Sequence, residues 1–142
     1  MTAAIGQLPK GEGYLVEEMA SGGLCELLIG VSREQDGLGM LTVGAGGIYT
    51  ELLRDKVHLL LPVDREEVRS ALRSLRVWPV LNGYRGKPKA DINALVDTIM
   101  AVARLAGADD GPVELEINPL IVRPQDVIAV DALIVKPIER KS

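Results

Sequence analysis

The sequence contains few of the residues on which several common kinds of site and cross-link depend. Among its 142 residues there is one cysteine, Cys25. A single cysteine excludes an internal disulfide and leaves no CxxC pair for a zinc site. No apolar run approaches the roughly 20 residues that a membrane-spanning helix needs, and the sequence has no internal repeat or low-complexity tract.

Strong charge of one sign is also missing. The 16 Lys and Arg residues and the 20 Asp and Glu residues give a net charge of −4, and the basic residues are dispersed. A dispersed pattern argues against a nucleic acid or a polyanionic membrane as the main partner. Because residues 1–13 also lack the apolar core of a signal peptide, we expect a cytoplasmic protein that binds neither nucleic acid nor membrane.

What the sequence does have is enough apolar material for one compact domain. Hydrophobic residues make up 47% of the chain, and its mean hydropathy is +0.17. Breaks that contain glycine, proline or serine separate apolar stretches of strand length. The stretches that we expect to form strands are YLVEEMA (14–20), LCELLIGVS (24–32), LGMLTV (38–43), IYTELL (48–53) and KVHLLLPV (56–63).

The periodicity then changes to that of helices. Asp64 followed three residues later by Glu67 signals a helix start, and the apolar residues of 68–75 keep the spacing of a one-sided helix. A second helix is expected over 92–106, with Gly107 as its stop. Since two further strands close the chain, we expect an α+β fold in which an antiparallel sheet carries two main helices on one face.

The closing stretches place oxygen-bearing side chains together. ELEINPLIV puts Glu114, Glu116 and Asn118 at alternate positions, so they would share one face of a strand. In the next stretch, VIAVDALIV, one carboxylate, Asp131, interrupts an apolar pattern.

The register of this hairpin follows from its turn. If RPQD makes a two-residue turn, Arg123 faces Asp126, and the numbers of every facing pair sum to 249. Asn118 then faces Asp131, and Glu116 lies one same-face pair further along. A longer loop with shifted pairing is the alternative, because proline at the first turn position favours a type I turn over the primed types.

Glu116, Asn118 and Asp131 would together form a hard-oxygen site of low charge. Mg²⁺ suits such a site, because it keeps several waters and takes one or two protein carboxylates together with nucleotide phosphates. On spacing alone, the alternative is equally good: a polar outer strand face in which Asp131 is solvated.

Several stretches resemble one known family in its own order. VELEINPLIV followed by IAVDALIV is similar to the end of the ATP-grasp domain in the NDP-forming acyl-CoA synthetases, which include the beta subunit of ADP-forming acetyl-CoA synthetase. YLVEEM resembles that family's hinge strand, GLCELLIGVSRE its ribose-side strand, VGAGGIYTELLRD its glycine-rich segment and LNGYRGKPKADINALV its arginine loop. The resemblance implies the C-terminal lobe of an ATP-grasp fold over 13–137, with a flexible segment over 1–12 and a flexible tail over 138–142.

The resemblance also implies roles for individual residues near the phosphates. Asn118 and Asp131 match the positions that hold the nucleotide's Mg²⁺, and Glu116 matches a catalytic carboxylate beside them. Gly46 and Gly47 match a segment that contacts phosphate or acyl phosphate. From the residues alone, that segment would be read as a tight connection between strands.

Other positions match the adenosine end of the nucleotide. Glu17, Glu18 and Met19 match the hinge that offers backbone hydrogen bonds to adenine. Glu26 matches the acid that accepts hydrogen bonds from the ribose hydroxyls. Because neighbouring strand residues face opposite sides, at most one of Glu17 and Glu18 can face the nucleotide.

The remaining candidates are charged or titratable. Arg85 lies in a glycine-containing cationic loop and would reach a phosphate, whereas the two lysines of that loop are expected to be solvated. Glu51 and Asp55 match acids of the family pattern, and Glu51 is counted with the catalytic candidates. His58 lies in no matching motif and is expected to be a packed or edge residue of a strand.

The resemblance implies the nucleotide- and Mg²⁺-binding lobe of an ADP-forming acyl-CoA synthetase. This ATP-grasp acid–thiol ligase interconverts acyl-CoA, ADP and phosphate with free acid, CoA and ATP. Its expected partners are the first ATP-grasp lobe and the CoA-binding domains, without which the lobe is not expected to act. The alternatives are a regulatory module like those fused to protein acetyltransferases, and an ATP-grasp ligase with another acceptor. We also expect a homo-oligomer at high concentration, formed through the edge strand YLVEEM.

Overall fold

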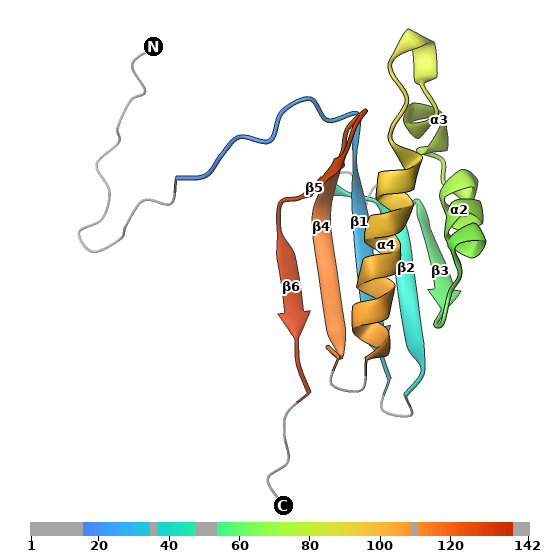
Figure 1. Cartoon of the computed structure of the whole chain (residues 1–142), viewed down its shortest axis with the longest axis vertical. Coiled ribbons are helices and arrows are strands. Elements are labelled where there is room, and N and C mark those ends of the chain that lie inside the picture. The colour runs from blue at the N-terminus through green and yellow to red at the C-terminus, as the bar shows by residue number, and fades with distance from the viewer. Residues whose placement is uncertain (1–15, 35–36, 48–53, 109–110, 138–142) are drawn as a thin grey trace, which may run out of the picture.

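One antiparallel sheet forms the body of the molecule. The computed structural model describes residues 16–34, 37–47, 54–108 and 111–137. Within them the strand order is β3-β2-β1-β4-β5, and β6 also pairs with β4 (Figure 1). The strands are β1 (Cys25–Arg33), β2 (Gly39–Ala45), β3 (Lys56–Leu60), β4 (Glu114–Val122), β5 (Val127–Ala129) and β6 (Ala132–Val135).

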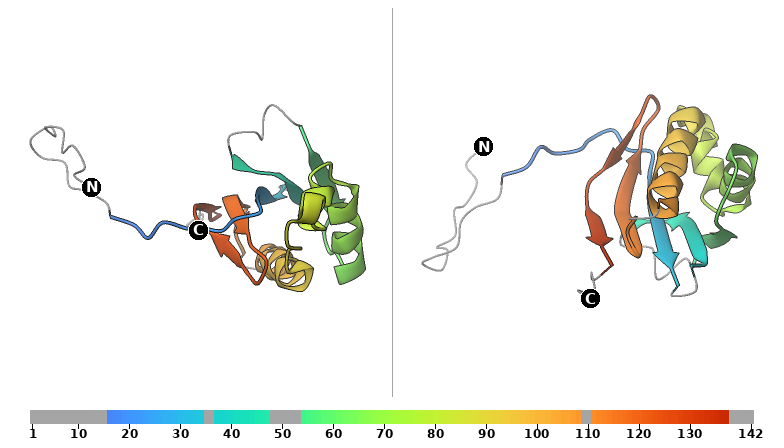
Figure 2. Two further views of the ribbon diagram at one scale, coloured as in Figure 1. Left: turned by 90° about the horizontal axis from the view of Figure 1, so that it is seen from above. Right: turned by 60° about the horizontal axis from the view of Figure 1, so that its bottom comes forward.

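Two main helices cover one face of this sheet, which confirms the predicted α+β fold (Figures 1 and 2). The helical elements are α2 (Arg65–Ser74), the short α3 (Trp78–Leu81), the 3₁₀ turn η2 (Tyr84–Gly86) and α4 (Ile92–Gly107). The longer helix, α4, contacts β1, β2 and β4, and α2 contacts α4 and β3. None of the helices in the described ranges is long and apolar enough to cross a bilayer.

Both main helices begin where the sequence predicts. The Asp64 carboxylate accepts hydrogen bonds from the backbone N–H groups of Glu66 and Glu67, and the Glu67 side chain accepts one from the N–H of Asp64. This reciprocal arrangement satisfies N–H groups that have no partner within the first turn of α2. Asp91 caps α4 in a similar way, by accepting from the N–H of Ala94.

The core lies between the sheet and the helices. Its largest fully buried side chains come from both layers: Leu27, Ile29, Leu41, Val43, Val68, Leu72, Leu81, Leu95, Val96, Ile99, Leu120 and Val122. The other surface of the sheet, here called the open face, carries none of the described helices (Figure 2). Because only one face is covered, residues 56–59 of β3 and 114–117 of β4 alternate between polar residues toward the open face and apolar residues toward the helices. The short β6 is apolar and exposed along its whole length.

The hairpin register is confirmed along its whole length. The pairs Val122–Val127 and Leu120–Ala129 join β4 to β5, and Glu116–Leu133 joins β4 to β6, all with the predicted sum. The partner strand is interrupted at residues 130–131, so it forms two short strands instead of one. Pairing nevertheless continues through the interruption, because the N–H of Asn118 donates to the carbonyl of Asp131 at 3.2 Å.

A bulge at residues 118–119 changes the alternation of β4. Leu27 of β1 pairs with Leu120, but Ile29 pairs with Ile117, so β4 has one more residue than β1 between these two pairs. Without this extra residue, the apolar side chains on one side of the bulge would point to the open face. With it, Ile117 and Leu120 both reach the core.

The prediction that YLVEEM forms an edge strand is wrong for the residues described. Residues 16–23 form no strand, and the segment runs away from the sheet (Figure 1). Val16 and Met19 are almost fully exposed. An alternating pattern gives strand propensity but needs a neighbouring strand to pair with, and none of the described strands lies beside this segment. The stretch IYTELL lies outside the described residues.

Asp55 is the buried charged residue of the described ranges, and its role is structural. It is 6% exposed, and its two carboxylate oxygens accept hydrogen bonds from the N–H groups of Arg76 at 2.8 Å and Val77 at 2.9 Å. These N–H groups come just before α3, so the carboxylate joins the start of β3 to the α2–α3 connection. A buried carboxylate is tolerated here because it is hydrogen-bonded.

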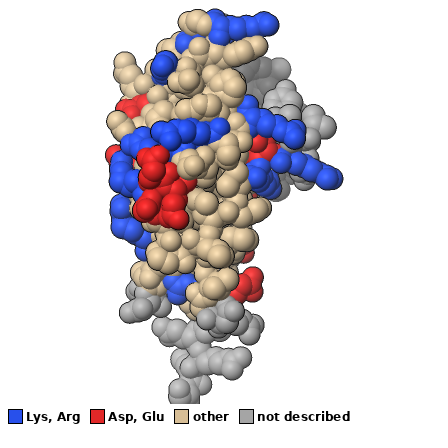
Figure 3. Space-filling view, turned by 90° about the vertical axis from the view of Figure 1, so that its right-hand side faces the viewer, with Lys and Arg blue, Asp and Glu red and all other residues tan. Residues whose placement is uncertain are grey.

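The outer surface of α2 carries interspersed charges. Arg65 pairs with Asp97 of α4 at 2.5 Å, and Arg73 pairs with Glu66 at 2.9 Å. Basic and acidic side chains lie next to each other on this side of the molecule (Figure 3). These exposed pairs make a solvated surface and contribute little to stability.

We expect Asp55→Ala to lower the free energy of unfolding by about 3 kcal/mol, because it removes two charge-assisted hydrogen bonds and leaves two N–H donors without an acceptor. The matched control is Asp97→Ala, which removes an exposed ion pair and is expected to cost less than about 1 kcal/mol. Urea unfolding followed by circular dichroism measures both. Equal losses in the two variants would contradict the structural role of Asp55.

Candidate functional site

Two of the predicted metal residues, Glu116 and Asn118, lie on β4, and the third, Asp131, lies in the interruption between β5 and β6. Asn118 and Asp131 are joined by a backbone hydrogen bond, and Glu116 precedes them on β4. Glu116 and Asn118 are half-buried, whereas Asp131 is exposed. The apolar neighbours of Glu116 on β4, Leu115 and Ile117, point to the core, as the alternation predicts.

The glycine-rich segment packs directly against this strand. The N–H of Gly47 donates to the side-chain oxygen of Asn118 at 3.0 Å. The N–H of Gly46 donates to the carbonyl of Glu26 at 2.9 Å. Three stretches that are far apart in the sequence therefore meet here: the start of β1, the end of β2 and the middle of β4.

Close approach explains why glycines occupy positions 46 and 47. A Cβ atom on Gly46 would lie 2.4 Å from the carbonyl carbon of Leu27, and one on Gly47 would lie 1.7 Å from the Glu26 carboxylate. Gly47 also has φ +66°, which disfavours other residues. The predicted ribose residue Glu26 thus lies against the predicted phosphate segment.

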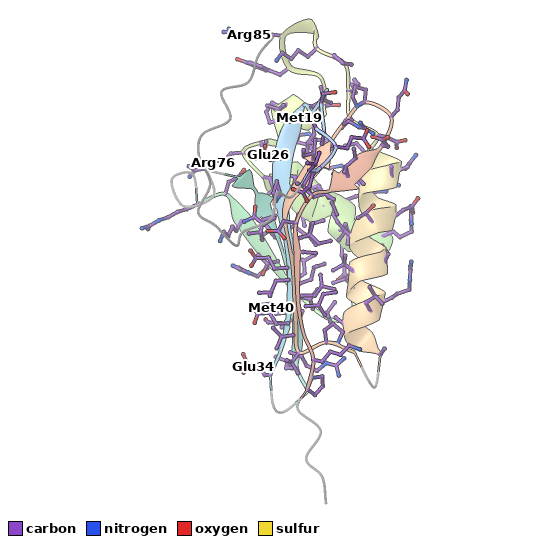
Figure 4. All side chains as sticks on the ribbon, turned by 90° about the vertical axis from the view of Figure 1, so that its left-hand side faces the viewer. Met19, Glu26, Glu34, Met40, Arg76 and Arg85 are labelled. Carbon is purple, nitrogen blue, oxygen red and sulfur yellow. The ribbon has the colours of Figure 1, made fainter. Side chains whose placement is uncertain are left out.

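The predicted adenine and arginine positions lie at the same end of the molecule but outside this cluster. In Figure 4, Arg85, Met19 and Glu26 all lie toward one end of the molecule, whereas Glu34 and Met40 lie toward the other end. Glu17, Glu18 and Met19 are exposed on the extended N-terminal segment. Arg85 is exposed in η2, with its guanidinium carbon 5.3 Å from the centroid of the Tyr84 ring.

Other candidates have different positions. Glu51 lies outside the described residues. His58 is exposed on β3, where its Nδ1 forms a 2.9 Å hydrogen bond with the Thr42 hydroxyl, as expected for an edge-strand histidine. Burial, with a smaller effect of Glu26, raises the pKa of Cys25 to about 11, so the thiol stays protonated near neutral pH.

The oxygen donors of Glu116, Asn118 and Asp131 fit Mg²⁺. Within the described ranges neither carboxylate forms an ion pair with a lysine or arginine. The Asn118 oxygen that accepts from Gly47 retains a second lone pair for a cation. In the part of the chain that the structure describes, no group of three or more His, Cys, Asp or Glu side chains is arranged to hold a metal ion. A metal site at Glu116, Asn118 and Asp131 therefore depends on the Asn118 amide and on oxygens of the ligand.

Sequence reasoning did not single out one further position on the open face. Gly30 lies in the middle of β1, next to Glu116 on β4 and Thr42 on β2. The feature of the sequence that could have identified Gly30 is its place inside the apolar run LCELLIGVS. Glycine within a strand marks a bulge or a close approach by a ligand or backbone.

Comparison with known proteins gives consistent matches along the chain. A family model described as an ATP-grasp domain matches residues 3–135. The ADP-forming acetate–CoA ligase I of Archaeoglobus fulgidus is 34% identical over 128 residues, which are 89% of this chain and 18% of that protein. The beta subunit of ADP-forming acetate–CoA ligase II from Pyrococcus furiosus is 31% identical over 126 residues, 87% of this chain and 53% of that subunit.

A solved structure agrees with these matches. The acetyl-coenzyme A synthetase 1 of Ca. Korarchaeum cryptofilum, in complex with coenzyme A and Mg-AMPPCP, superposes with a TM-score of 0.75 at 29% identity. The match covers 84% of this chain and 55% of that chain. The present chain therefore spans about half of the shorter relatives and less than a fifth of the long ones.

We expect Gly46→Ala to destabilise the fold more than Gly47→Ala. The Cβ at position 46 would collide with the β1 backbone, which cannot move without breaking the sheet. At position 47 it would meet an exposed side chain that can rotate, which leaves the left-handed backbone cost of about 1–2 kcal/mol.

Gly107→Ala is the matched control, because nothing lies within 4 Å of its Cβ, and it is expected to be neutral or stabilising. Thermal unfolding of the three variants gives the order. A Gly46→Ala protein as stable as the wild type would contradict the close approach.

Cys25 is expected to react slowly with iodoacetamide at pH 8. A pKa of about 11, against the ordinary 9.0, lowers the thiolate fraction on the order of 100-fold. The control is the same chain in urea, where the rate should reach that of a free thiol. Equal rates in both states would contradict the burial of this thiol. Because the unfolded thiol ionises first, its contribution to stability is retained below pH 9 and is lost as the pH rises toward 11.

Proposed function

The chain belongs to the family of ATP-grasp domains, and on that basis we propose that it is one nucleotide- and Mg²⁺-binding lobe of an ADP-forming acyl-CoA synthetase. The complete enzyme would interconvert acyl-CoA, ADP and phosphate with free acid, CoA and ATP. The proposal extends to this chain what the names of its relatives state of those proteins.

One observation supports the proposal more than any other. The hydrogen bond from Gly47 to Asn118 joins the segment proposed to contact phosphate to the strand proposed to hold the metal. Glu26, proposed for the ribose, lies against the same glycine. Residues that a nucleotide would contact along its length are thus adjacent, although they are up to 92 positions apart in the sequence.

The chemical task of the lobe is positioning and charge compensation. Phosphoryl transfer asks for little covalent chemistry from the protein and much for a fixed arrangement of charges around the phosphates. Asn118 and Asp131 would hold Mg²⁺, which when bound compensates phosphate charge as a Lewis acid, and Glu116 would act as the carboxylate beside it. Because they have no side chains, Gly46 and Gly47 would let the phosphate oxygens approach the backbone of their segment closely. Glu26 would orient the ribose, and Arg85 would approach from the η2 turn.

The proposed partners are the other parts of such a synthetase. The relatives include both long single chains and a beta subunit, so the remaining regions would be supplied in the same chain or by another subunit. We propose the first ATP-grasp lobe and CoA-binding domains in that role. A regulatory module is not favoured, because the matched relatives are ligases.

In the complete synthetase, we expect Asn118→Ala and Asp131→Ala each to abolish turnover, because each removes an oxygen donor to the metal. Circular dichroism should be unchanged, since neither residue is part of the buried core. Asp126→Ala is the matched control: it removes the Arg123–Asp126 ion pair of the same hairpin and should retain activity. If the Asn118 and Asp131 variants kept wild-type rates across Mg²⁺ concentrations, the hairpin would be a polar strand face only.

The 142-residue chain by itself should bind Mg·ATP weakly or undetectably in isothermal titration, because the proposed site lies between two lobes and this chain provides contacts from one side. Micromolar affinity would contradict the half-site. The control is a titration of the complete synthetase under the same conditions, which is expected to show binding.

A further inference from the structure

The centre of the open face contains a hollow of about 200 Å³ above Gly30. Strand pairing places Gly30 of β1 opposite Thr42 of β2 on one side and Glu116 of β4 on the other. His58 of β3 pairs with Thr42, so these four residues form one row across four strands. Because Gly30 has no side chain, the row is open at its middle.

The backbone does not require glycine at this position. Gly30 has no positive φ, and a Cβ atom would meet its nearest neighbours at 3.9 Å, which is an ordinary contact. Gly44 and Gly46 differ, since a Cβ at either would approach backbone atoms within 2.6 Å. Glycine in a strand interior weakens the strand, and it occurs at bulges and where a ligand or another backbone approaches closely. The bulge lies opposite Leu28 and no backbone atom comes closer than 3.9 Å to that Cβ, so approach by a ligand is the remaining reason at Gly30.

The two sides of the hollow carry opposite charge. Glu114 and Glu116 line it from β4, and Lys56 and His58 line it from β3. Hydrogen bonding of Nδ1 to Thr42 fixes the His58 ring. Within the described ranges, Lys56 and the two glutamates form no ion pair, so a protein charge neutralises none of them.

A ligand that carries both signs of charge matches this arrangement. Carboxylates bind hard divalent cations, and lysine and histidine donate hydrogen bonds to phosphate oxygens. A divalent cation paired with a phosphate group would place its cation toward β4 and its oxygens toward β3. A bare anion would be repelled by Glu114 and Glu116, and a bare cation by Lys56.

We propose that the hollow above Gly30 binds a phosphate group paired with a divalent cation, with Lys56 and His58 contacting the phosphate oxygens and Glu116 on the cation side. The proposal rests on the proposed function, in which Glu116 lies beside the metal, and extends that site across the sheet to β3. The phosphate would come either from the end of the nucleotide or from free inorganic phosphate.

The test is an NMR titration of the ¹⁵N,¹³C-labelled 142-residue chain. The probes are Mg²⁺ alone, inorganic phosphate alone, the two together, and Mg·ADP and Mg·ATP. We expect the Gly30 amide and the His58 ring resonances to shift with Mg²⁺ and phosphate together, and to shift little with either alone. A shift with Mg·ATP but not with Mg²⁺ and phosphate would identify the nucleotide as the source.

Two variants remove the site in different ways. Gly30→Val fills the hollow, and Lys56→Gln removes a cation, so each should weaken the apparent affinity about tenfold. The matched controls are Gly107→Ala and Lys136→Gln, which alter a glycine and a lysine outside the hollow and should titrate as the wild type does. If Gly30→Val fails to fold, Gly30→Ala, whose Cβ fits, and Lys56→Gln decide.

The inference is overturned if Mg²⁺ and phosphate shift neither Gly30 nor His58 and Mg·ATP does not either. It is also overturned if the variants at positions 30 and 56 titrate as the wild type does. Shifts at Gly47 and Asn118 with Mg·ATP, without shifts at Gly30 and His58, would overturn this inference and leave the proposed function standing. Shifts at Gly30 and His58 with Mg²⁺ and phosphate, without any effect of nucleotide at Gly47, would support the hollow, and the Asn118 and Asp131 variants of the complete synthetase would then decide on the proposed nucleotide site.

Discussion

The rest of the structure depends on how β4 fits between its two neighbours. This strand must give apolar side chains to the core on both sides of residues 118–119 and must also present oxygen donors on the open face. A regular strand of this sequence cannot do both, because its core residues have odd numbers before residue 118 (Leu115 and Ile117) and even numbers after residue 119 (Leu120 and Val122). The bulge opposite Leu28 absorbs one residue, so Ile117 and Leu120 both reach the core. Asn118 is released at that point from regular pairing with β1, and its side chain accepts the Gly47 N–H.

The site is built on strands, and this gives it a fixed geometry. Glu116 and Asn118 are held by a strand that is paired on both sides, and Gly46 is held by a backbone hydrogen bond to Glu26. Asp55 adds a second attachment: its carbonyl accepts from the N–H of Ala45, and its side chain holds the α2–α3 connection. In the proposed function, charges fixed in this way would need no rearrangement when phosphate charge develops beside them, which is the property that electrostatic catalysis requires. Met19 and Arg85, in contrast, lie on segments that project from the sheet (Figures 1 and 4).

One face of the sheet stabilises the fold, and the other carries the residues proposed to bind ligands. The helix-covered face carries the fully buried leucines, isoleucines and valines, and burial of this apolar surface stabilises the fold. The open face carries the glutamates, Thr42, Lys56 and His58, and its central glycine leaves room for a ligand. Changes of charge on the open face therefore affect binding with little effect on folding, whereas changes of volume on the other face affect folding first.

The sequence alone determined the features that depend on local chemistry. Asp64 and Glu67 set the start of α2, the apolar spacing set the buried side of α4, and the turn at Pro124 and Gln125 set the register that joins Asn118 to Asp131. It did not determine whether YLVEEM has a strand to pair with, why Asp55 is buried, or that Gly30 lies in a row with His58 and Glu116. Each of these depends on which segments distant in the sequence become neighbours. Caps, periods and tight turns are decided by residues within a few positions of each other, whereas pairing between distant strands and the burial of a charge are decided only when the whole sheet and its helices have packed.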